Sequence, residues 1–269
     1  MDTADVLDAL WRDYVASTPQ AARVHALLTA RGEQIRNDHV ALRTYGIAGI
    51  GIESLARPFE ALGWEARDTY RFADKHLVAR YWQHPDKALP KIFISELCLG
   101  ELSGAAQVLV SDLVSQLPTN FGMRDDLPWA GRPWTPSHAE YRALLAESEY
   151  AAWVCAFGFR VNHYTVDANA LTTFAGLSEL NAFLVENGFT LNDSGGVIKG
   201  NPGERLEQSS TRADAVSVRF SDATVTIPSC YYEFARRYPL PSGERFEGFV
   251  PASADKIFES TDVSPRRSP

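Results

Sequence analysis

The sequence has few cysteines, and they are not clustered. Cys98, Cys155 and Cys230 are the three in 269 residues, and no pair stands at the C-x-x-C spacing of a thiolate metal site. Because all three have apolar neighbours, we expect reduced core residues, with neither a disulfide framework nor a thiolate-bound metal.

Long apolar runs and an excess of positive charge are also missing. No window approaches the roughly 20 apolar residues of a membrane-spanning helix. The first ten residues, MDTADVLDAL, are acidic and unlike a signal peptide. The formal net charge of −8 and the pI near 5.3 disfavour nucleic acids and anionic membranes as partners. We therefore expect a cytoplasmic protein that binds small molecules, although nothing indicates its oligomeric state.

A nucleotide phosphate loop is absent as well. The segment SGGVIKG (194–200) lacks the G-x-x-x-x-G-K-[ST] spacing, and its flanks have the pattern of strands. We interpret it as a hairpin over a pocket. Gln208 and Ser210, which follow it, are candidates for polar contacts to a ligand, although a solvated strand fits them equally well.

The first part of the chain has a β-α-β-β-β pattern. Two helices are expected around residues 7–14 and from Pro19 toward Gly32, where Thr18-Pro19 is typical of a helix start. A strand with alternating faces follows from residue 38, and a helix then runs over 52–62 and ends at Gly63. Strands are expected from Trp64, over 76–82 and over 91–97.

The second part repeats this order after a helical connector. FRVNHYTV (159–166) has a strand pattern, a helix is expected over 177–184, and a strand restarts at Phe189. We predict an α+β protein with duplicated β-α-β-β-β modules, which form a curved sheet around a metal pocket with added helices. The expected ranges are 1–102 for the N-terminal helices and first module, 103–150 for the connector, 151–259 for the second module, and 260–269 for a flexible tail of this one compact domain.

The two modules can be laid over each other residue by residue. His39 stands 24 residues before Gly63, and His163 stands 25 residues before Gly188. LARPFEALGW (55–64) matches LNAFLVENGF (180–189) between them. The last strand of each half carries a glutamate, Glu96 or Glu233, and the second half is longer by an insertion around residues 194–210.

Equivalent inward positions of a duplicated module converge on one point, and the residues here suit a metal. Two neutral imidazoles and one carboxylate form a facial triad, which leaves open positions and is typical of Fe(II) oxygenases. We assign this triad to His39, His163 and Glu233. The alternative is that both histidines are hydrogen-bonded strand residues and that Glu233 lies at an edge. Glu96 could be a fourth ligand, hold a ligating histidine in place, or be structural.

Arg43 is the candidate for substrate recognition. Strand alternation places it on the same face as His39, four residues away, so its side chain could bind a carboxylate with two parallel hydrogen bonds. The alternative is an arginine that extends to solvent.

Four segments together resemble one known family. NDHVALRTY (37–45), KIFISEL (91–97), GGVIKG with LEQSSTRAD (195–200 and 206–214) and CYYEFARR (230–237) are similar to the 2-oxoadipate dioxygenase/decarboxylase family. The resemblance implies the vicinal oxygen chelate fold, with Fe(II) held by His39, His163 and Glu233 and the 2-oxo acid bound by Arg43. The implied reaction converts 2-oxoadipate and dioxygen to 2-hydroxyglutarate and CO2. A purified sample could carry another divalent metal, such as Zn, Mn or Ni.

Two other functions stay open at this point. A metal-dependent isomerase or lyase of the same superfamily would use a redox-inert ion and a glutamate, Glu96 or Glu233, as a general base. A non-catalytic small-molecule-binding protein of this fold is expected to lack the metal ligands, which this sequence retains.

Overall fold

The computed structural model describes residues 1–251, so the expected tail at 260–269 and the end of the second module lie outside the described residues. The chain opens with two helices, α1 (Thr3–Ser17) and α2 (Pro19–Ala30). The Asp2 carboxylate accepts a hydrogen bond from the backbone N–H of Asp5 and caps α1, while Pro19 occupies the first turn of α2. Both predicted helices are confirmed.

The first module follows the predicted order. It comprises β1 (Asn37–Tyr45), α3 (Ile52–Ala61), β2 (Glu65–Phe72), β3 (Leu77–Gln83) and β4 (Lys91–Leu97). Helix α3 ends where Gly63 adopts a φ of 101°, a left-handed conformation that glycine adopts without a steric penalty. A 3-10 turn, η1 (Ala73–Lys75), joins β2 to β3.

The second module comprises β5 (Val161–Asp167), α7 (Leu177–Glu186), β6 (Lys199–Asn201), β7 (Leu206–Ser210) and β10 (Tyr231–Arg237). Its β6 and β7 are joined by η5 (Pro202–Glu204), the counterpart of η1. Each of the two turns is followed by a left-handed residue, His76 after η1 and Arg205 after η5. The duplication therefore extends to the conformation of single residues.

One eight-stranded sheet contains both modules, in the order β2-β3-β4-β1-β5-β10-β7-β6. The first strands of the modules, β1 and β5, are antiparallel neighbours at its centre. Each also pairs in parallel with the last strand of its own module, β4 or β10. The sheet curls into a half-barrel, which confirms the predicted α+β fold with duplicated β-α-β-β-β modules.

Two details of the second module were predicted wrongly. Residues 194–210 are not an insertion, because they contain β6 and β7, the counterparts of β2 and β3. The added element is a separate hairpin, β8 (Ala215–Arg219) and β9 (Thr224–Pro228), between β7 and β10. No strand begins at Phe189, where the described backbone forms only an isolated bridge between Leu191 and Thr211.

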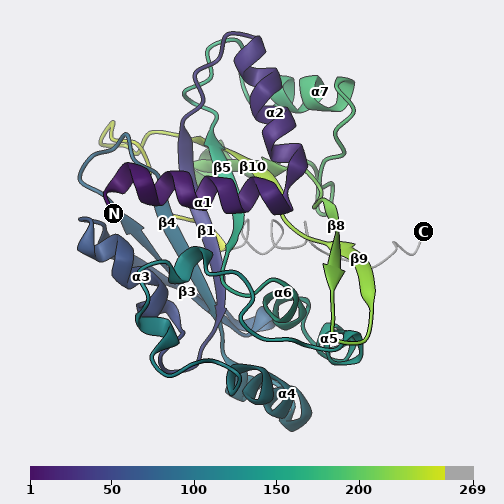
Figure 1. Cartoon of the computed structure of the whole chain (residues 1–269). Coiled ribbons are helices and arrows are strands. Elements are labelled where there is room, and N and C mark those ends of the chain that lie inside the picture. The colour runs from purple at the N-terminus through teal and green to yellow at the C-terminus, as the bar shows by residue number, and fades with distance from the viewer. Residues whose placement is uncertain (252–269) are drawn as a thin grey trace.

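Helices cover both faces of the curled sheet. Figure 1 shows α1 lying across the central strands, where the rings of Trp11 and Tyr14 pack on Tyr164 and Tyr232. Because side chains alternate along a strand, His163 faces the opposite, concave side. The metal pocket is therefore expected inside the curl.

The connector contributes three helices, α4 (Gly104–Val114), α5 (His138–Leu145) and α6 (Glu149–Phe157). The expected boundary at residue 150 falls inside α6, and the division into ranges remains a prediction. Helix α6 packs against β1 from the concave side, where Tyr45 donates a hydrogen bond to the carbonyl of Ala151. No helix in residues 1–251 has the length and apolar character needed to span a membrane.

Candidate metal centre

Three buried side chains from adjacent strands converge on the concave face of the sheet. They are His39 of β1, His163 of β5 and Glu233 of β10. Nε2 of His39 lies 3.7 Å from Oε1 of Glu233, and Nε2 of His163 lies 3.4 Å from Oε2. The three donor atoms all lie within 4.8 Å of one another. The structure thus brings together the three residues that the sequence grouped.

A buried carboxylate fixes the orientation of the His39 ring. Oδ1 of Asp38 lies 2.8 Å from Nδ1 of His39, which directs Nε2 of the imidazole toward Glu233. Asp38 in turn accepts hydrogen bonds from the guanidinium groups of Arg237 and Arg245. This arrangement is typical of metal-binding histidines, whose second ring nitrogen bonds to a carboxylate or carbonyl.

The second module repeats the arrangement with an amide. Nδ1 of His163 lies 3.0 Å from Oδ1 of Asn162, the residue immediately before it. Tyr231 stacks on the His163 ring, with 4.6 Å between the ring centroids and an interplanar angle of 22°. Asp38 and Asn162 were not predicted from the sequence, although a polar residue directly precedes each histidine.

Burial sets the charge of the three groups. Burial lowers the pKa of His39, although the neighbouring Asp38 acts in the opposite direction. Burial, together with His39 and Arg43, holds the pKa of His163 well below its ordinary value. Both imidazoles are therefore neutral at physiological pH, the state that binds a metal. Burial raises the pKa of Glu233 to about 8.

The surroundings of Glu233 fit a cation. Oε1 accepts a hydrogen bond of 2.6 Å from Nε2 of Gln208, whereas Oε2 is buried and receives no hydrogen bond from any described residue. Ser210 is the strand partner of Glu233 and is fully buried. A buried carboxylate oxygen without a donor is costly, and a divalent metal beside two imidazoles would satisfy it. The structure thus places Gln208 and Ser210 beside Glu233, and neither is solvated.

Glu96 is not the counterpart of Glu233. His39 pairs with Lys91 and His163 pairs with Tyr231, so the residue equivalent to Glu233 is Phe93. Glu96 is three residues beyond Phe93 and therefore points to the opposite, convex face. This expected equivalence was wrong, because matching residue types did not preserve the pairing register.

The structure gives Glu96 a different contact. Its Oε2 accepts a hydrogen bond of 2.8 Å from the backbone N–H of Ile52, at the first turn of α3. A carboxylate at a helix N-terminus satisfies an unpaired N–H and stabilises the helix dipole. Of the three roles considered for Glu96, this contact matches the structural one.

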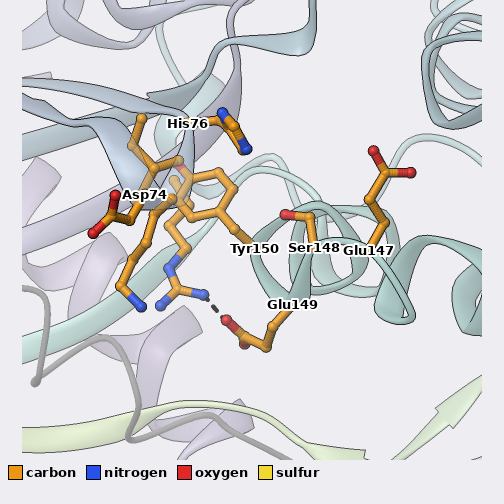
Figure 2. Close-up of a pocket in the computed structure, with 9 residues that line it drawn as sticks. Asp74, His76, Glu147, Ser148, Glu149 and Tyr150 are labelled. Atoms are coloured by element: carbon orange, nitrogen blue, oxygen red, sulfur yellow. Dashed lines mark ion pairs between the residues drawn. The ribbon is translucent and has the colours of Figure 1, made fainter. Parts of the chain in front are cut away.

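Arg43 is buried rather than extended to solvent, with 1% of its surface exposed. Its guanidinium lies over the rings of Tyr150 and Trp153, at 5.0 and 5.3 Å from their centroids. Nη1 of Arg43 is 3.5 Å from Oε1 of Glu149, an ion pair drawn in Figure 2. The side chain thus lies on the same face of β1 as His39 and contacts α6.

A pocket of about 180 Å³ leads from the surface to Arg43. Asp74 and His76, near η1, line one side of it, and Glu149 and Tyr150, at the start of α6, line the other (Figure 2). His76 was expected to begin the strand over 76–82. It instead follows η1, and its Nδ1 lies 3.0 Å from Oε2 of Glu101.

An aromatic side chain from the end of the described chain closes the opposite side of the centre. Phe249 packs edge-to-face on His39, with 4.9 Å between the ring centroids, and its ring centroid lies 4.8 Å from that of Phe93. The carbonyls of Phe246 and Gly248 accept hydrogen bonds from Arg237, the arginine that holds Asp38. The contacts of this segment were not predicted from the sequence, because it has no periodic pattern of apolar residues.

A family model agrees with the geometry. Residues 3–117 and 127–246 match the model of the 2-oxoadipate dioxygenase/decarboxylase family. The chain belongs to this family. A chloroplastic/amyloplastic 2-oxoadipate dioxygenase/decarboxylase of Oryza sativa subsp. japonica is 35% identical over 98% of this chain and 80% of its own length. A chloroplastic relative from Arabidopsis thaliana is 37% identical over 85% and 69%, respectively.

Several solved structures share the fold. The Oryza sativa hydroxyglutarate synthase in complex with 2-oxoadipate is 34% identical, with a TM-score of 0.91 over 96% of this chain and 91% of that one. A Shewanella frigidimarina protein described as a hydrolase is 47% identical, with a TM-score of 0.89 over 93% and 98%. A glyoxalase superfamily protein from Ralstonia eutropha, at 22% identity and a TM-score of 0.71 over 91% and 84%, shows the fold alone.

Proposed function

We propose that this protein is an Fe(II)-dependent dioxygenase/decarboxylase that converts 2-oxoadipate and dioxygen to 2-hydroxyglutarate and CO2. The observation that carries the proposal is the buried cluster of His39, His163 and Glu233, in a chain of the 2-oxoadipate dioxygenase/decarboxylase family. The rice structure with bound 2-oxoadipate supports the choice of substrate. We propose that the protein acts in the cytoplasm, although both plant relatives are described as chloroplastic.

In this proposal, Nε2 of each histidine and the carboxylate of Glu233 hold the metal. Two imidazoles and one carboxylate leave positions open for a chelating 2-oxo acid and for dioxygen. When bound, Fe(II) would supply the redox chemistry with dioxygen that no protein side chain provides. Asp38 and Asn162 keep both rings oriented, and Gln208 holds one oxygen of Glu233.

The remaining residues bind and orient the substrate. Arg43, at the inner end of the pocket, is placed to bind a substrate carboxylate with two parallel hydrogen bonds. That carboxylate would take the place that Glu149 holds beside the guanidinium. Phe249, packed on His39, keeps water away from that side of the reacting groups.

The test is reconstitution of the metal-free protein with Fe(II) under argon, followed by oxygen and CO2 measurements with a panel of 2-oxo acids. We expect consumption of 2-oxoadipate without an added co-substrate, and release of CO2 and 2-hydroxyglutarate. His39→Ala, His163→Ala and Glu233→Ala should each abolish metal binding and turnover, while Glu53→Gln, a surface control, should abolish neither. Equal turnover with Zn(II) under argon would instead favour an isomerase or lyase.

A further inference from the structure

Tyr231 stands beside the metal centre in a fixed orientation. It lies on β10 two residues before Glu233, so both side chains point to the concave face. Its ring stacks on His163, and its backbone carbonyl accepts a hydrogen bond from the hydroxyl of Tyr14. One contact therefore holds the ring and the other holds the backbone of this residue.

The hydroxyl of Tyr231 is buried without a hydrogen bond from any described residue. A buried tyrosine normally directs its hydroxyl to a partner, because an unsatisfied polar group in the interior is costly. Tyr231 is level with Ala41 of β1 in the sheet, whereas Glu233 is level with His39, so Tyr231 lies nearer to Arg43 along the strands. An acceptor that enters this space would satisfy the hydroxyl.

The equivalent position in the first module is already satisfied. Lys91 pairs with His39 as Tyr231 pairs with His163, and its ammonium group forms an ion pair with Glu247. The ammonium group of Lys91, beside His39, thus has a partner, whereas the hydroxyl of Tyr231, beside His163, has none among the described residues.

We propose that the Tyr231 hydroxyl donates a hydrogen bond to an oxygen of the 2-oxo acid, next to the metal ligands, and so binds the reacting end of the substrate. A phenol, with an ordinary pKa of about 10, is a donor at physiological pH. The inference rests on the proposed function, because it requires an anionic 2-oxo acid in this site.

The adjacent residue provides a matched control. Tyr232 is also fully buried, and its hydroxyl also lacks a hydrogen bond from the described residues. It faces the convex side, where it packs on Trp11 and Tyr14 of α1. Tyr232→Phe therefore removes the same atom one residue away, on the other side of the sheet.

The experiment measures binding of 2-oxoadipate by calorimetry to the zinc-loaded wild type, Tyr231→Phe and Tyr232→Phe, with metal content determined by elemental analysis. Zinc prevents turnover with dioxygen, so binding alone is observed. We expect Tyr231→Phe to keep its zinc and to raise Kd about tenfold or more, as is typical for loss of a hydrogen bond to a charged group. Tyr232→Phe should bind like the wild type.

An unchanged Kd in Tyr231→Phe, or equal losses in both variants, would overturn the inference. So would loss of zinc from Tyr231→Phe, since the residue would then act through His163. If the wild type binds another 2-oxo acid of the panel but not 2-oxoadipate, the proposed substrate fails and the same comparison with that acid still tests Tyr231. If the wild type binds no 2-oxo acid, the inference fails together with the proposed function.

Discussion

Asp38 and His39 are neighbours in sequence and partners in space, with 2.8 Å between Oδ1 and Nδ1. The carboxylate is completely buried and is held from the other side by Arg237, which is equally buried. Burial raises the pKa of Asp38, but the charges of Arg237 and Lys91 outweigh it and hold that pKa well below its ordinary value. Asp38 therefore has two roles: it orients the proposed ligand His39, and it neutralises the buried guanidinium of Arg237.

We predict that Asp38→Asn weakens both the fold and the metal site. Arg237 would be left buried without its counter-charge, which typically costs about 3–5 kcal/mol of unfolding free energy. Weaker orientation of His39 should lower metal affinity about 10- to 100-fold. Urea unfolding of the metal-free protein and a metal titration measure the two effects.

Arg245→Gln is the control for this prediction. Arg245 also contacts Asp38, but 35% of its side chain is exposed. Partly exposed ion pairs typically contribute about 1 kcal/mol or less. If Arg245→Gln lowered the unfolding free energy as much as Asp38→Asn does, the uncompensated charge of the buried Arg237 would not explain the effect of Asp38→Asn.

Metal binding should release a proton from Glu233. Burial raises the pKa of this carboxyl to about 8 in the metal-free protein, whereas the lowered pKa values keep both histidines neutral. Below about pH 8 the metal therefore displaces one proton, and affinity should rise about tenfold per pH unit. Above that pH the dependence should level off.

Calorimetric titration in buffers of different ionisation enthalpy, between pH 6.5 and 9, counts the released protons. Glu233→Gln, which carries no titratable proton, should abolish both the release and the tight binding. Proton release that is as large at pH 9 as at pH 6.5 would exclude Glu233 as its source.

Arg43→Lys should impair catalysis even though it keeps the charge. A lysine cannot form two parallel hydrogen bonds to a carboxylate, and losing a buried contact of this kind costs about 2–5 kcal/mol. We expect kcat/KM for 2-oxoadipate to fall roughly 30- to several-thousand-fold with metal content unchanged. Glu149→Gln, which leaves the guanidinium in place and removes the carboxylate that the substrate would displace, should not lower kcat/KM. Near-normal kinetics in Arg43→Lys would assign this arginine to the fold.

Glu96→Ala should affect stability and leave the metal alone. The substitution removes the acceptor for the Ile52 N–H and the negative charge at the start of α3. Such a loss typically lowers the free energy of unfolding by about 1 kcal/mol, which should be measurable as a lower Tm. Metal affinity should equal that of the wild type, because the side chain faces the convex side. A clear drop in metal affinity would restore Glu96 to the site.

Much of the centre could be predicted because its signals are local. Strand alternation and the almost equal spacing from each histidine to its helix-ending glycine identify His39 and His163 as equivalent. The register between strands is not local, which explains the error at Glu96. Whether Phe93 or Glu96 faces His39 depends on how β4 pairs with β1, and that pairing follows from packing across the whole sheet.

The contacts that support the centre could not be predicted either, because they join residues far apart in the sequence. Asp38 and Arg237 are 199 residues apart, and no periodicity connects them. Phe249 lies in a segment without a helix or strand pattern, yet its ring contacts His39. In contrast, the polar residue before each histidine was visible in the sequence and offers a signal for related chains.

The replacement of a second carboxylate by Phe93 has a stereochemical consequence. Two identical modules would have built a symmetric site, with equivalent groups on either side of the metal. Here one flank is aromatic, from Phe93 and Phe249, and the other carries the cation of Arg43. In the proposed reaction the hydroxyl group enters at the methylene next to the keto carbon, and a 2-oxo acid anchored at Arg43 can then present only one of the two hydrogens of that methylene to the reagent. We expect the hydroxy acid to leave this site as a single enantiomer.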